Sequence, residues 1–295
     1  IEPAIAATMT TSPPPPVLVR TVELPSSGHI ALIVSLNRPE KKNCFDIQLV
    51  HALSAAFRDI SRKVREQQLQ QSDDGGEGRI AAVILAGEGS SFCAGADLSN
   101  PPSPLDASSD LPHHLHNNPV HQMSLCRVPI IAALKGYVIT GGFELALACD
   151  ILVGDSSTLF RDTHVKFGLA PCWGLSQKLQ RRVGPGRAKM ISLSACKVKA
   201  EQACAFGLLD ELVPDGTTSL DRAVEIADQI ASNNLSMVQR YLRAIHEGGS
   251  LDLAKGLQRE RELGIAHYIE AVGDSSTFES AKDFITDGTR PRSKL

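Results

Sequence analysis

The chain has 295 residues, a formal net charge of −3 at pH 7 and 21% charged residues. This length can bury a large core, as one large domain or as one domain with an appendage. The near-neutral charge gives no reason to expect a nucleic acid or an anionic membrane as partner. No stretch approaches the roughly 20 apolar residues that span a bilayer, so we expect a soluble protein.

The first part of the chain predicts two strands followed by a long helix. Residues 1–16 include four consecutive prolines and are expected to form a disordered leader. The apolar runs 17–24 and 29–36 flank a Ser-Ser-Gly turn and predict two strands. Apolar residues then recur at helical spacing over about 46–65, with Asp46 as N-cap, and the polar, glycine-rich stretch 67–78 predicts an exposed loop.

Strand and helix patterns alternate in the middle of the chain. The predicted strands are 80–85, 129–134 and 151–154, and the predicted helices are about 120–126 and 143–148. This alternation, with spacing long enough for crossovers, predicts an α/β fold with parallel strands.

Two stretches outside this alternation differ in character. Residues 99–119 are crowded with Pro, Ser, Asp and His, and their length predicts a mobile functional loop beside a site. The last third of the chain predicts a helical layer, with helices expected at 186–194, 199–206, 220–233, 236–247 and 251–268.

Two glycine-bearing segments carry the strongest functional signal. Gly141 and Gly142 precede a predicted helix, where a missing Cβ lets a ligand approach the backbone closely. Ala96 follows Gly95 in the other segment, so its N–H is a candidate second donor. Two N–H groups aimed at one point form an oxyanion hole that stabilises the enolate oxygen of a thioester. The alternative is that Gly141 and Gly142 only permit tight helix–strand packing.

With these segments in view, the sequence resembles the enoyl-CoA hydratase/isomerase (crotonase) superfamily, and within it the peroxisomal hydratases of plants. The resemblance runs from about residue 17 to 290. It rests on residues 36–39, 94–98, 141–146, 167–169, 173–175 and 203–213.

The resemblance implies a crotonase (ClpP-like) fold, a spiral of repeated ββα units with a helical C-terminal region that drives trimerisation. The implied organisation is a core at 17–185 that holds the acyl-CoA site, a helical region at 186–290 and a tail at 291–295. It also implies an acyl-CoA substrate, a homotrimer or a dimer of trimers, and an oxyanion hole at the N–H groups of Ala96 and Gly141. The implied substrate-binding residues are Ala94, Gly95, Ala96, Asp97, Leu98, Gly141, Lys41, Lys42 and Trp173. For the two lysines, an ordinary surface position is nearly as good an explanation. For Trp173, packing in the core is an equally good one.

Hydratases of this superfamily use two glutamates, one to activate water and one to protonate Cα. Glu144 matches the first by position, but His164 stands at the second, and this is the main departure from the pattern. Histidine can exchange a proton near neutral pH. Asp162 lies two residues earlier, and in an extended segment both side chains would face the same way, so that Asp162 would orient the imidazole and favour its protonated form.

The reading that follows is an enoyl-CoA hydratase that converts 2-trans-enoyl-CoA to 3-hydroxyacyl-CoA in fatty-acid β-oxidation. A Δ3-Δ2-enoyl-CoA isomerase, or other enolate chemistry such as decarboxylation or thioester hydrolysis, stays open, since one carboxylate suffices for a proton shuttle. An acyl-CoA-binding subunit with little catalysis is the alternative of another class.

Neither a metal nor a cofactor is expected, because CoA is part of the substrate. The histidines of the 99–119 loop and the seven cysteines lack metal-ligand spacing. Ser293, Lys294 and Leu295 form the tripeptide that the peroxisomal import receptor reads, which predicts a peroxisomal protein.

Overall fold

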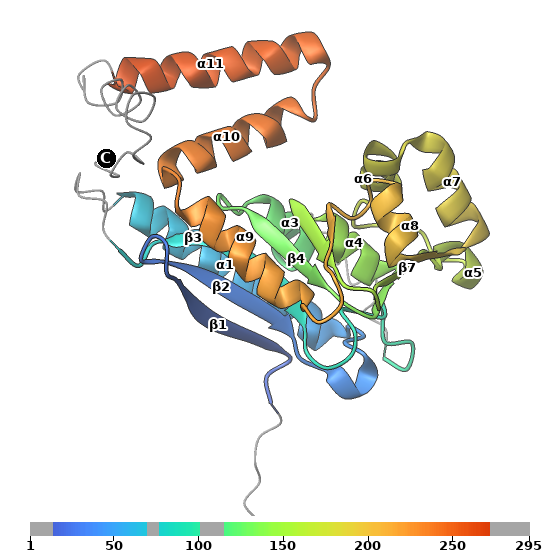
Figure 1. Cartoon of the computed structure of the whole chain (residues 1–295). Helices are drawn as coiled ribbons and strands as arrows, with labels where there is room; N and C mark the ends of the chain where they lie inside the picture. Colours follow the sequence, from blue (N-terminus) through green and yellow to red (C-terminus); the bar gives the residue numbers. More distant parts are fainter. Residues whose placement is uncertain (1–13, 70–76, 101–114, 272–295) are drawn as a thin grey trace, which may run out of the picture.

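The structure, a computed structural model, describes residues 14–69, 77–100 and 115–271. Figure 1 shows two strand layers with helices around them and a helical hairpin that extends from one end. The predicted leader up to residue 13, most of the predicted 99–119 loop and the 291–295 tail lie outside the described residues.

A mixed six-stranded sheet forms the main layer. Its spatial order is β1 (Val17–Leu24), β2 (His29–Leu36), β3 (Ile80–Gly87), β4 (Ile130–Leu134), β6 (Ile151–Gly154) and β9 (Glu211–Leu212). β1 is antiparallel to β2, and every later pair of neighbours is parallel. The predicted parallel pairing and the five predicted strands are therefore confirmed, while β9, only two residues long, was not predicted.

A second, three-stranded sheet consists of β5 (Tyr137–Ile139), β7 (Leu159–Arg161) and β8 (Lys197–Lys199). β5 and β7 are parallel, and β7 and β8 are antiparallel. None of these strands was predicted, because three residues are too few to show an alternating pattern.

The two sheets are joined by repeated ββα units. In one unit β4 belongs to the large sheet, β5 belongs to the small sheet, and α4 (Gly141–Leu147) follows. In the next unit β6 and β7 repeat this arrangement and α5 (His164–Phe167) follows. This repeat agrees with the expected spiral of ββα units, and it places the starts of α4 and α5 side by side, since both follow neighbouring parallel strands.

The two faces of the large sheet are covered by α1 (Ile47–Leu69) and α9 (Ser219–Ala231) (Figure 1). Alternate residues of β2 divide between them: Leu32 and Val34 belong to the apolar cluster that includes α1, and Ala31 and Ile33 to the one that includes α9. This is the period-2 alternation of a strand buried on both faces.

The start of α1 was predicted correctly and its end was not. The side chain of Asp46 accepts from the N–H of Leu49 at 2.9 Å, as an N-cap does. The helix runs to Leu69 instead of 65, because Gln67 and Gln68 bond other segments: Gln67 Oε1 accepts from the N–H of Ile80, and Gln68 bonds Gln239.

The structure contains further helices besides α1, α4, α5 and α9. They are the short η1 (Pro39–Lys41), α3 (Pro119–Ser124), α6 (Leu175–Val183), α7 (Pro185–Ser194), α8 (Ala200–Ala205), α10 (Leu235–Gly248) and α11 (Leu253–Ala271). The helix α6 was missed, because its buried residues Leu175, Leu179 and Val183 form a narrow stripe between polar residues. None of the described helices is both long and apolar enough to cross a membrane.

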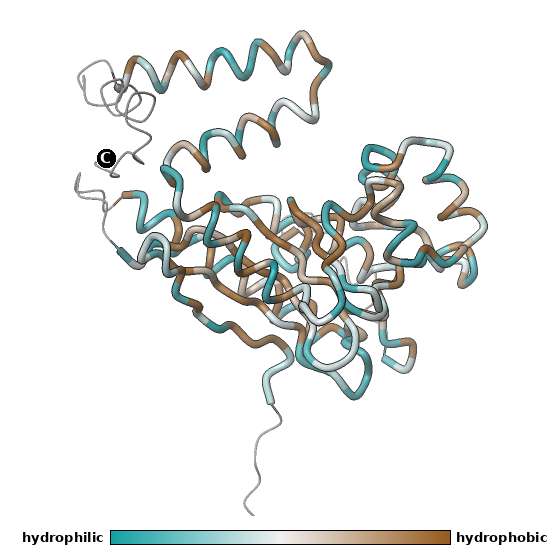
Figure 2. The backbone as a smooth tube through the Cα atoms, viewed as in Figure 1, coloured by the Kyte–Doolittle hydropathy of each residue, from teal (hydrophilic) through white to brown (hydrophobic). Residues whose placement is uncertain are grey.

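The helices α10 and α11 form a hairpin that projects from the layered core (Figure 1). Apolar residues are scattered among polar ones along both helices (Figure 2). Several large apolar side chains of the hairpin are mostly exposed in the single chain, among them Tyr241, Ile245, Leu253 and Ile265.

Candidate active site

A cavity of about 640 Å³ opens beside the small sheet and the two glycine-bearing segments. Seven of the predicted substrate-binding residues line it, namely Lys41, Lys42, Ala94, Gly95, Ala96, Asp97 and Leu98. The opposite side is formed by β5, by β7 and by residues that follow them, including Thr140 and Thr163. The cavity therefore borders the 94–98 segment of the predicted site, whereas the predicted residues Gly141, Trp173, Glu144, Asp162 and His164 are not among its lining residues.

The N–H of Ala96 is directed away from its neighbouring strand. Phe45 pairs with this segment through a parallel bridge, in which the N–H of Phe45 donates to Gly95 O and the N–H of Asp97 donates to Phe45 O, both at 2.9 Å. In such a pairing the N–H of the middle residue points to the other side. Gly95 adopts φ +95, a conformation that favours glycine, where the chain turns toward Ala96.

Gly141 is the first residue of α4 and is buried against Phe45. A Cβ at this position would lie 2.4 Å from Cζ of Phe45, and a Cβ at Gly142 would lie 2.4 Å from the carbonyl oxygen of Cys93. Close packing therefore requires glycine at both positions. Because the first turn of a helix leaves its N–H groups without helical partners, the N–H of Gly141 stays a candidate for the oxyanion hole beside that of Ala96.

Glu144 lies on α4, one turn after Gly141, and its side chain is 4% exposed. Its Oε1 atom accepts from the N–H of Trp173 at 2.8 Å and from the N–H of Leu175 at 3.3 Å. Burial raises the pKa of this carboxyl above its usual 4.5, although the hydrogen bond from Trp173 and the nearby His164 oppose the rise. Two backbone donors thus hold one oxygen, and the other oxygen is available for chemistry.

His164 and Asp162 form a buried pair. Oδ1 of Asp162 accepts both from the backbone N–H of His164 at 3.0 Å and from its ring Nδ1 at 2.7 Å. A carboxylate only accepts, so Nδ1 carries a proton, and Nε2 is the ring nitrogen on the side of Glu144. Burial raises the pKa of Asp162, but the hydrogen bonds from His164 and Ser192 outweigh burial and leave that pKa below its ordinary value.

The predicted contact between Asp162 and His164 is confirmed, but the predicted reason for it is wrong. His164 is the first residue of α5, not part of an extended segment. The two side chains meet because the Asp162 carboxylate turns back over the start of the helix and binds the same residue through backbone and ring.

Glu144 and His164 face each other across a short gap. Nε2 of His164 lies 3.8 Å from Oε2 of Glu144. This separation is too long for a direct hydrogen bond, but a single water molecule can bond both atoms at ordinary distances. The pair can therefore hold one water molecule between a carboxylate that accepts a proton and an imidazole that can donate one.

Lys41 and Asp97, both predicted to bind substrate, form an ion pair with each other. Nζ of Lys41 lies 2.8 Å from Oδ2 of Asp97, and the same oxygen accepts from Arg38 at 3.0 Å. Hydrogen bonds from Lys41, Ser99 and Arg38 hold the pKa of Asp97 well below its usual range. Asp97 therefore fixes its loop to the 38–41 segment, whereas Lys42 lies with its Nζ 4.6 Å from the centre of the Tyr137 ring.

Trp173 supports the site through its ring and through its backbone N–H. Its ring stacks on Phe45 with centroids 5.0 Å apart, and its backbone N–H donates to Glu144. The sequence predicted a pocket or core residue at this position. The backbone donation to the carboxylate was missed, because a loop N–H has no sequence signature.

A pair of threonines was also missed. Oγ1 of Thr140 lies 2.5 Å from Oγ1 of Thr163 and accepts from the backbone N–H of Thr163 at 3.1 Å. Thr140 adopts φ 51 and ψ −109, a conformation typical of glycine and one that costs other residues about 1–3 kcal/mol. The signal that could have found the pair is that both residues directly precede the predicted site residues Gly141 and His164.

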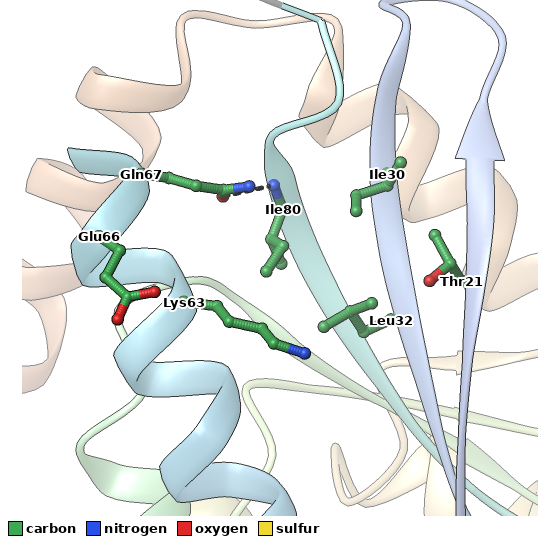
Figure 3. Close-up of a pocket in the computed structure, with 7 residues that line it drawn as sticks. All are labelled: Thr21, Ile30, Leu32, Lys63, Glu66, Gln67 and Ile80. Atoms are coloured by element: carbon green, nitrogen blue, oxygen red, sulfur yellow. Dashed lines mark hydrogen bonds between the residues drawn. The ribbon is translucent and has the colours of Figure 1, made fainter. Parts of the chain in front are cut away.

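Among the described residues, no group of three or more His, Cys, Asp or Glu side chains is arranged to hold a metal ion. A smaller pocket of about 280 Å³ lies between α1 and the first three strands (Figure 3). Its lining includes Lys63, Glu66 and Ile80 but none of the predicted site residues.

Comparison with known proteins agrees with this geometry. The family model for enoyl-CoA hydratase/isomerase matches residues 27–284. The chain is 37% identical over 271 residues to probable enoyl-CoA hydratase 1, peroxisomal, of Arabidopsis thaliana. This match covers 91% of the present chain and 94% of the relative. It is 29% identical over 269 residues to a short-chain-enoyl-CoA hydratase of Clostridium acetobutylicum, with the same coverage.

Solved structures show the same fold. The crystal structure of enoyl-CoA hydratase from Bacillus anthracis superposes with a TM-score of 0.75 at 26% identity, over 95% of this chain and 99% of that one. The α/β architecture of ββα units is thus shared with enoyl-CoA hydratases over nearly the whole chain.

Proposed function

Because the chain belongs to the enoyl-CoA hydratase/isomerase family, we propose that it is an enoyl-CoA hydratase that adds water to 2-trans-enoyl-CoA to give 3-hydroxyacyl-CoA in fatty-acid β-oxidation. The observation that carries this proposal is that Glu144 Oε2 and His164 Nε2 lie 3.8 Å apart, close enough for one water molecule beside them to bond both. The relatives from Arabidopsis and Clostridium, both named as enoyl-CoA hydratases, support it.

The proposed reaction begins with the thioester carbonyl between the N–H groups of Ala96 and Gly141. Glu144 takes a proton from the water, the water oxygen forms a bond to Cβ, and the electron pair of the double bond moves into the enolate, whose oxygen the two N–H groups stabilise. His164 then gives the Nε2 proton to Cα. The product gains one oxygen and two hydrogens, and the proton on Glu144 returns to His164 across the gap when the next water enters.

The structure offers support for Glu144 as the base and for His164 as the acid. The raised pKa of Glu144 makes it a stronger base than a solvated carboxylate. The Asp162 carboxylate, 2.7 Å from Nδ1, stabilises the charged imidazolium that protonates Cα. We propose that no metal and no redox cofactor takes part, since water and the thioester supply every atom of the product.

Basic residues around the cavity suit the phosphates of CoA. Lys42, Arg161 and Lys197 all line it, and Lys42 is not engaged by a carboxylate in the part of the chain that the structure describes. We assign contact with the CoA phosphates to Lys42 in preference to Lys41, whose Nζ is held by Asp97.

Two substrates test the reaction. Purified protein should convert crotonyl-CoA to 3-hydroxybutyryl-CoA, seen as loss of the absorbance of the conjugated thioester and as product by chromatography. No turnover of short or long 2-enoyl-CoA would overturn the proposal. A 3-enoyl-CoA that gains this absorbance would identify an isomerase, and tight acyl-CoA binding without turnover of either substrate would identify a binding subunit.

We further propose that the protein assembles as a homotrimer or a dimer of trimers through the hairpin of α10 and α11. Its exposed apolar side chains, such as Tyr241 and Ile245, form a surface that association would cover. Light scattering of the purified protein should give three or six chains per particle. Tyr241→Glu combined with Ile245→Lys should yield monomers, and a wild-type monomer at micromolar concentration would contradict this proposal.

A peroxisomal location is proposed from two observations. The Arabidopsis relative is named as peroxisomal, and residues 293–295 of this chain, outside the described residues, match the peroxisomal tripeptide. A fluorescent fusion to the amino end should collect in peroxisomes, and deletion of residues 293–295 should release it. An undeleted fusion that stays diffuse would contradict the proposal.

A further inference from the structure

The site is assembled at the starts of two helices that belong to different ββα units. Gly141 and Glu144 lie on α4, which follows β5, and His164 begins α5, which follows β7. β5 and β7 are paired in parallel up to Ile139 and Arg161. Beyond these residues the strand pairing ends, so the positions of the two helix starts depend on what joins the next few residues.

Thr140 and Thr163 join the two chains at this point. Thr140 continues the ladder with one backbone bond, from its N–H to Arg161 O at 2.9 Å. Its hydroxyl then bonds both the backbone N–H and the hydroxyl of Thr163. Each threonine directly precedes a site residue, Gly141 in one case and His164 in the other.

Two features of the pair distinguish it from ordinary packing. Thr140 keeps φ 51, a backbone conformation that glycine adopts without strain, so a side chain at this position is retained against a conformational cost. Both threonines also line the cavity, and each is 9% exposed, so the bond between them borders the substrate space.

We infer that Thr140 and Thr163 are positioning residues: their hydroxyl pair holds the starts of α4 and α5 together and so sets the gap between Glu144 and His164 and the direction of the Gly141 N–H. This inference rests on the proposed hydratase function. A displacement of reacting groups by about 1 Å can lower a rate about a hundredfold. Loss of the pair should therefore lower kcat much more than it changes KM.

The decisive variant is Thr140→Gly. Glycine relieves the strain at φ 51, so the variant should unfold at a temperature equal to or above that of the wild type, while its kcat for crotonyl-CoA falls at least tenfold. Thr163→Val removes the other hydroxyl without changing the shape of the side chain and should show the same loss of kcat. Thr163→Ser keeps the hydroxyl and should restore kcat to within about threefold of wild type.

Thr158→Val is the matched control. Thr158 is a buried threonine just before β7, and its hydroxyl bonds Leu134 O and the N–H of Asp155, but it does not line the cavity. Its loss should lower the unfolding temperature and leave kcat nearly unchanged. If Thr140→Gly and Thr163→Val keep wild-type kcat, or if all these variants lose kcat only in proportion to lost folded protein, the inference is wrong.

A binding probe separates this inference from the proposed function. 4-(Dimethylamino)cinnamoyl-CoA absorbs at longer wavelength when its thioester carbonyl is polarised, so it reports on the oxyanion donors without turnover. Wild-type protein that shifts the probe but does not hydrate crotonyl-CoA would overturn the hydratase proposal alone. The positioning role alone would be overturned if the wild type hydrates crotonyl-CoA and the Thr140→Gly variant does so at the same rate, with the full wild-type shift of the probe.

Discussion

The ring Nε2 of His164 lies 3.8 Å from Oε2 of Glu144, although the two residues come from successive ββα units. Each side chain is fixed from its far side: Glu144 by the N–H groups of Trp173 and Leu175, and His164 by Asp162. The gap is therefore bounded by two oriented groups, and this relationship is the basis for the following predictions.

Glu144→Gln should abolish most of the hydration. The amide keeps an oxygen that can accept from the N–H of Trp173, so the fold should be retained, but it cannot take a proton from water. Loss of a general base typically costs about 10²- to 10⁴-fold in rate. Steady-state kinetics with crotonyl-CoA measure the loss, and calorimetric titration of an acyl-CoA should show little change in affinity. A variant with more than a tenth of the wild-type kcat would rule out Glu144 as the base.

On the acidic side, hydration activity should be lost at a higher pH than the ordinary pKa of a glutamate would give. Glu144 must be ionised to act, and burial raises its pKa from the usual 4.5, so activity is complete above the raised pKa and is lost as the pH falls through it. The profile of kcat/KM against pH measures this loss. A profile that stays flat down to pH 4.5 would contradict the assignment.

The same shift predicts a dependence of stability on pH. In the window between the unfolded and folded pKa values of Glu144, the folded chain holds the proton that the unfolded chain has released. The contribution of this group to the free energy of unfolding therefore falls as the pH rises through that window. Glu144→Gln should remove this component, which denaturant titrations at several pH values can measure against wild type.

Asp162→Asn should lower the rate of hydration. An asparagine can still accept from Nδ1 of His164, so the ring keeps a partner, but the negative charge that stabilises the imidazolium is lost. In steady-state kinetics with crotonyl-CoA, kcat should therefore fall about tenfold or more while KM changes little. A variant with wild-type kcat would show that Asp162 does not support an acid.

Gly141→Ala should damage both stability and activity through one contact. The added Cβ would lie 2.4 Å from Cζ of Phe45, so we expect a loss of about 1–3 kcal/mol in the free energy of unfolding. Phe45→Leu removes the ring atoms in conflict, and the double variant should be more stable than the sum of the single changes predicts. Strict additivity in denaturant titrations would mean that this clash is not the cause.

The sequence predicted the frame of the molecule well, because its signals are local. The strands 80–85 and 151–154 are continuous apolar runs, and the helix start at Asp46 has a recognisable cap. The segments with Ala96 and Gly141 were found because bare backbone is visible as glycine. Strands of three residues, such as β5 and β7, carry no such pattern, although they bring the site together.

The rest of the site could not be predicted, because it depends on contacts between distant segments. The pairing of Lys41 with Asp97 spans 56 residues, and the backbone bond from Trp173 to Glu144 spans 29. The sequence placed Asp162 beside His164 for a strand-based reason, whereas the observed cause is the helix start at His164. The hydroxyl pair of Thr140 and Thr163 also joins distant segments, 23 residues apart, and was missed for this reason.

The central claim, that Glu144 and His164 deliver one water molecule to an enoyl thioester, is tested most directly by isotopic labelling of a single turnover. Crotonyl-CoA is mixed with excess enzyme in H₂¹⁸O and D₂O, and the product is analysed by mass spectrometry for wild type, Glu144→Gln and His164→Gln. The account predicts that wild type places ¹⁸O at Cβ and one deuterium at Cα, and that each variant is slower by about a hundredfold or more. A wild-type product without ¹⁸O at Cβ, or His164→Gln that labels both carbons at the wild-type rate, would contradict it.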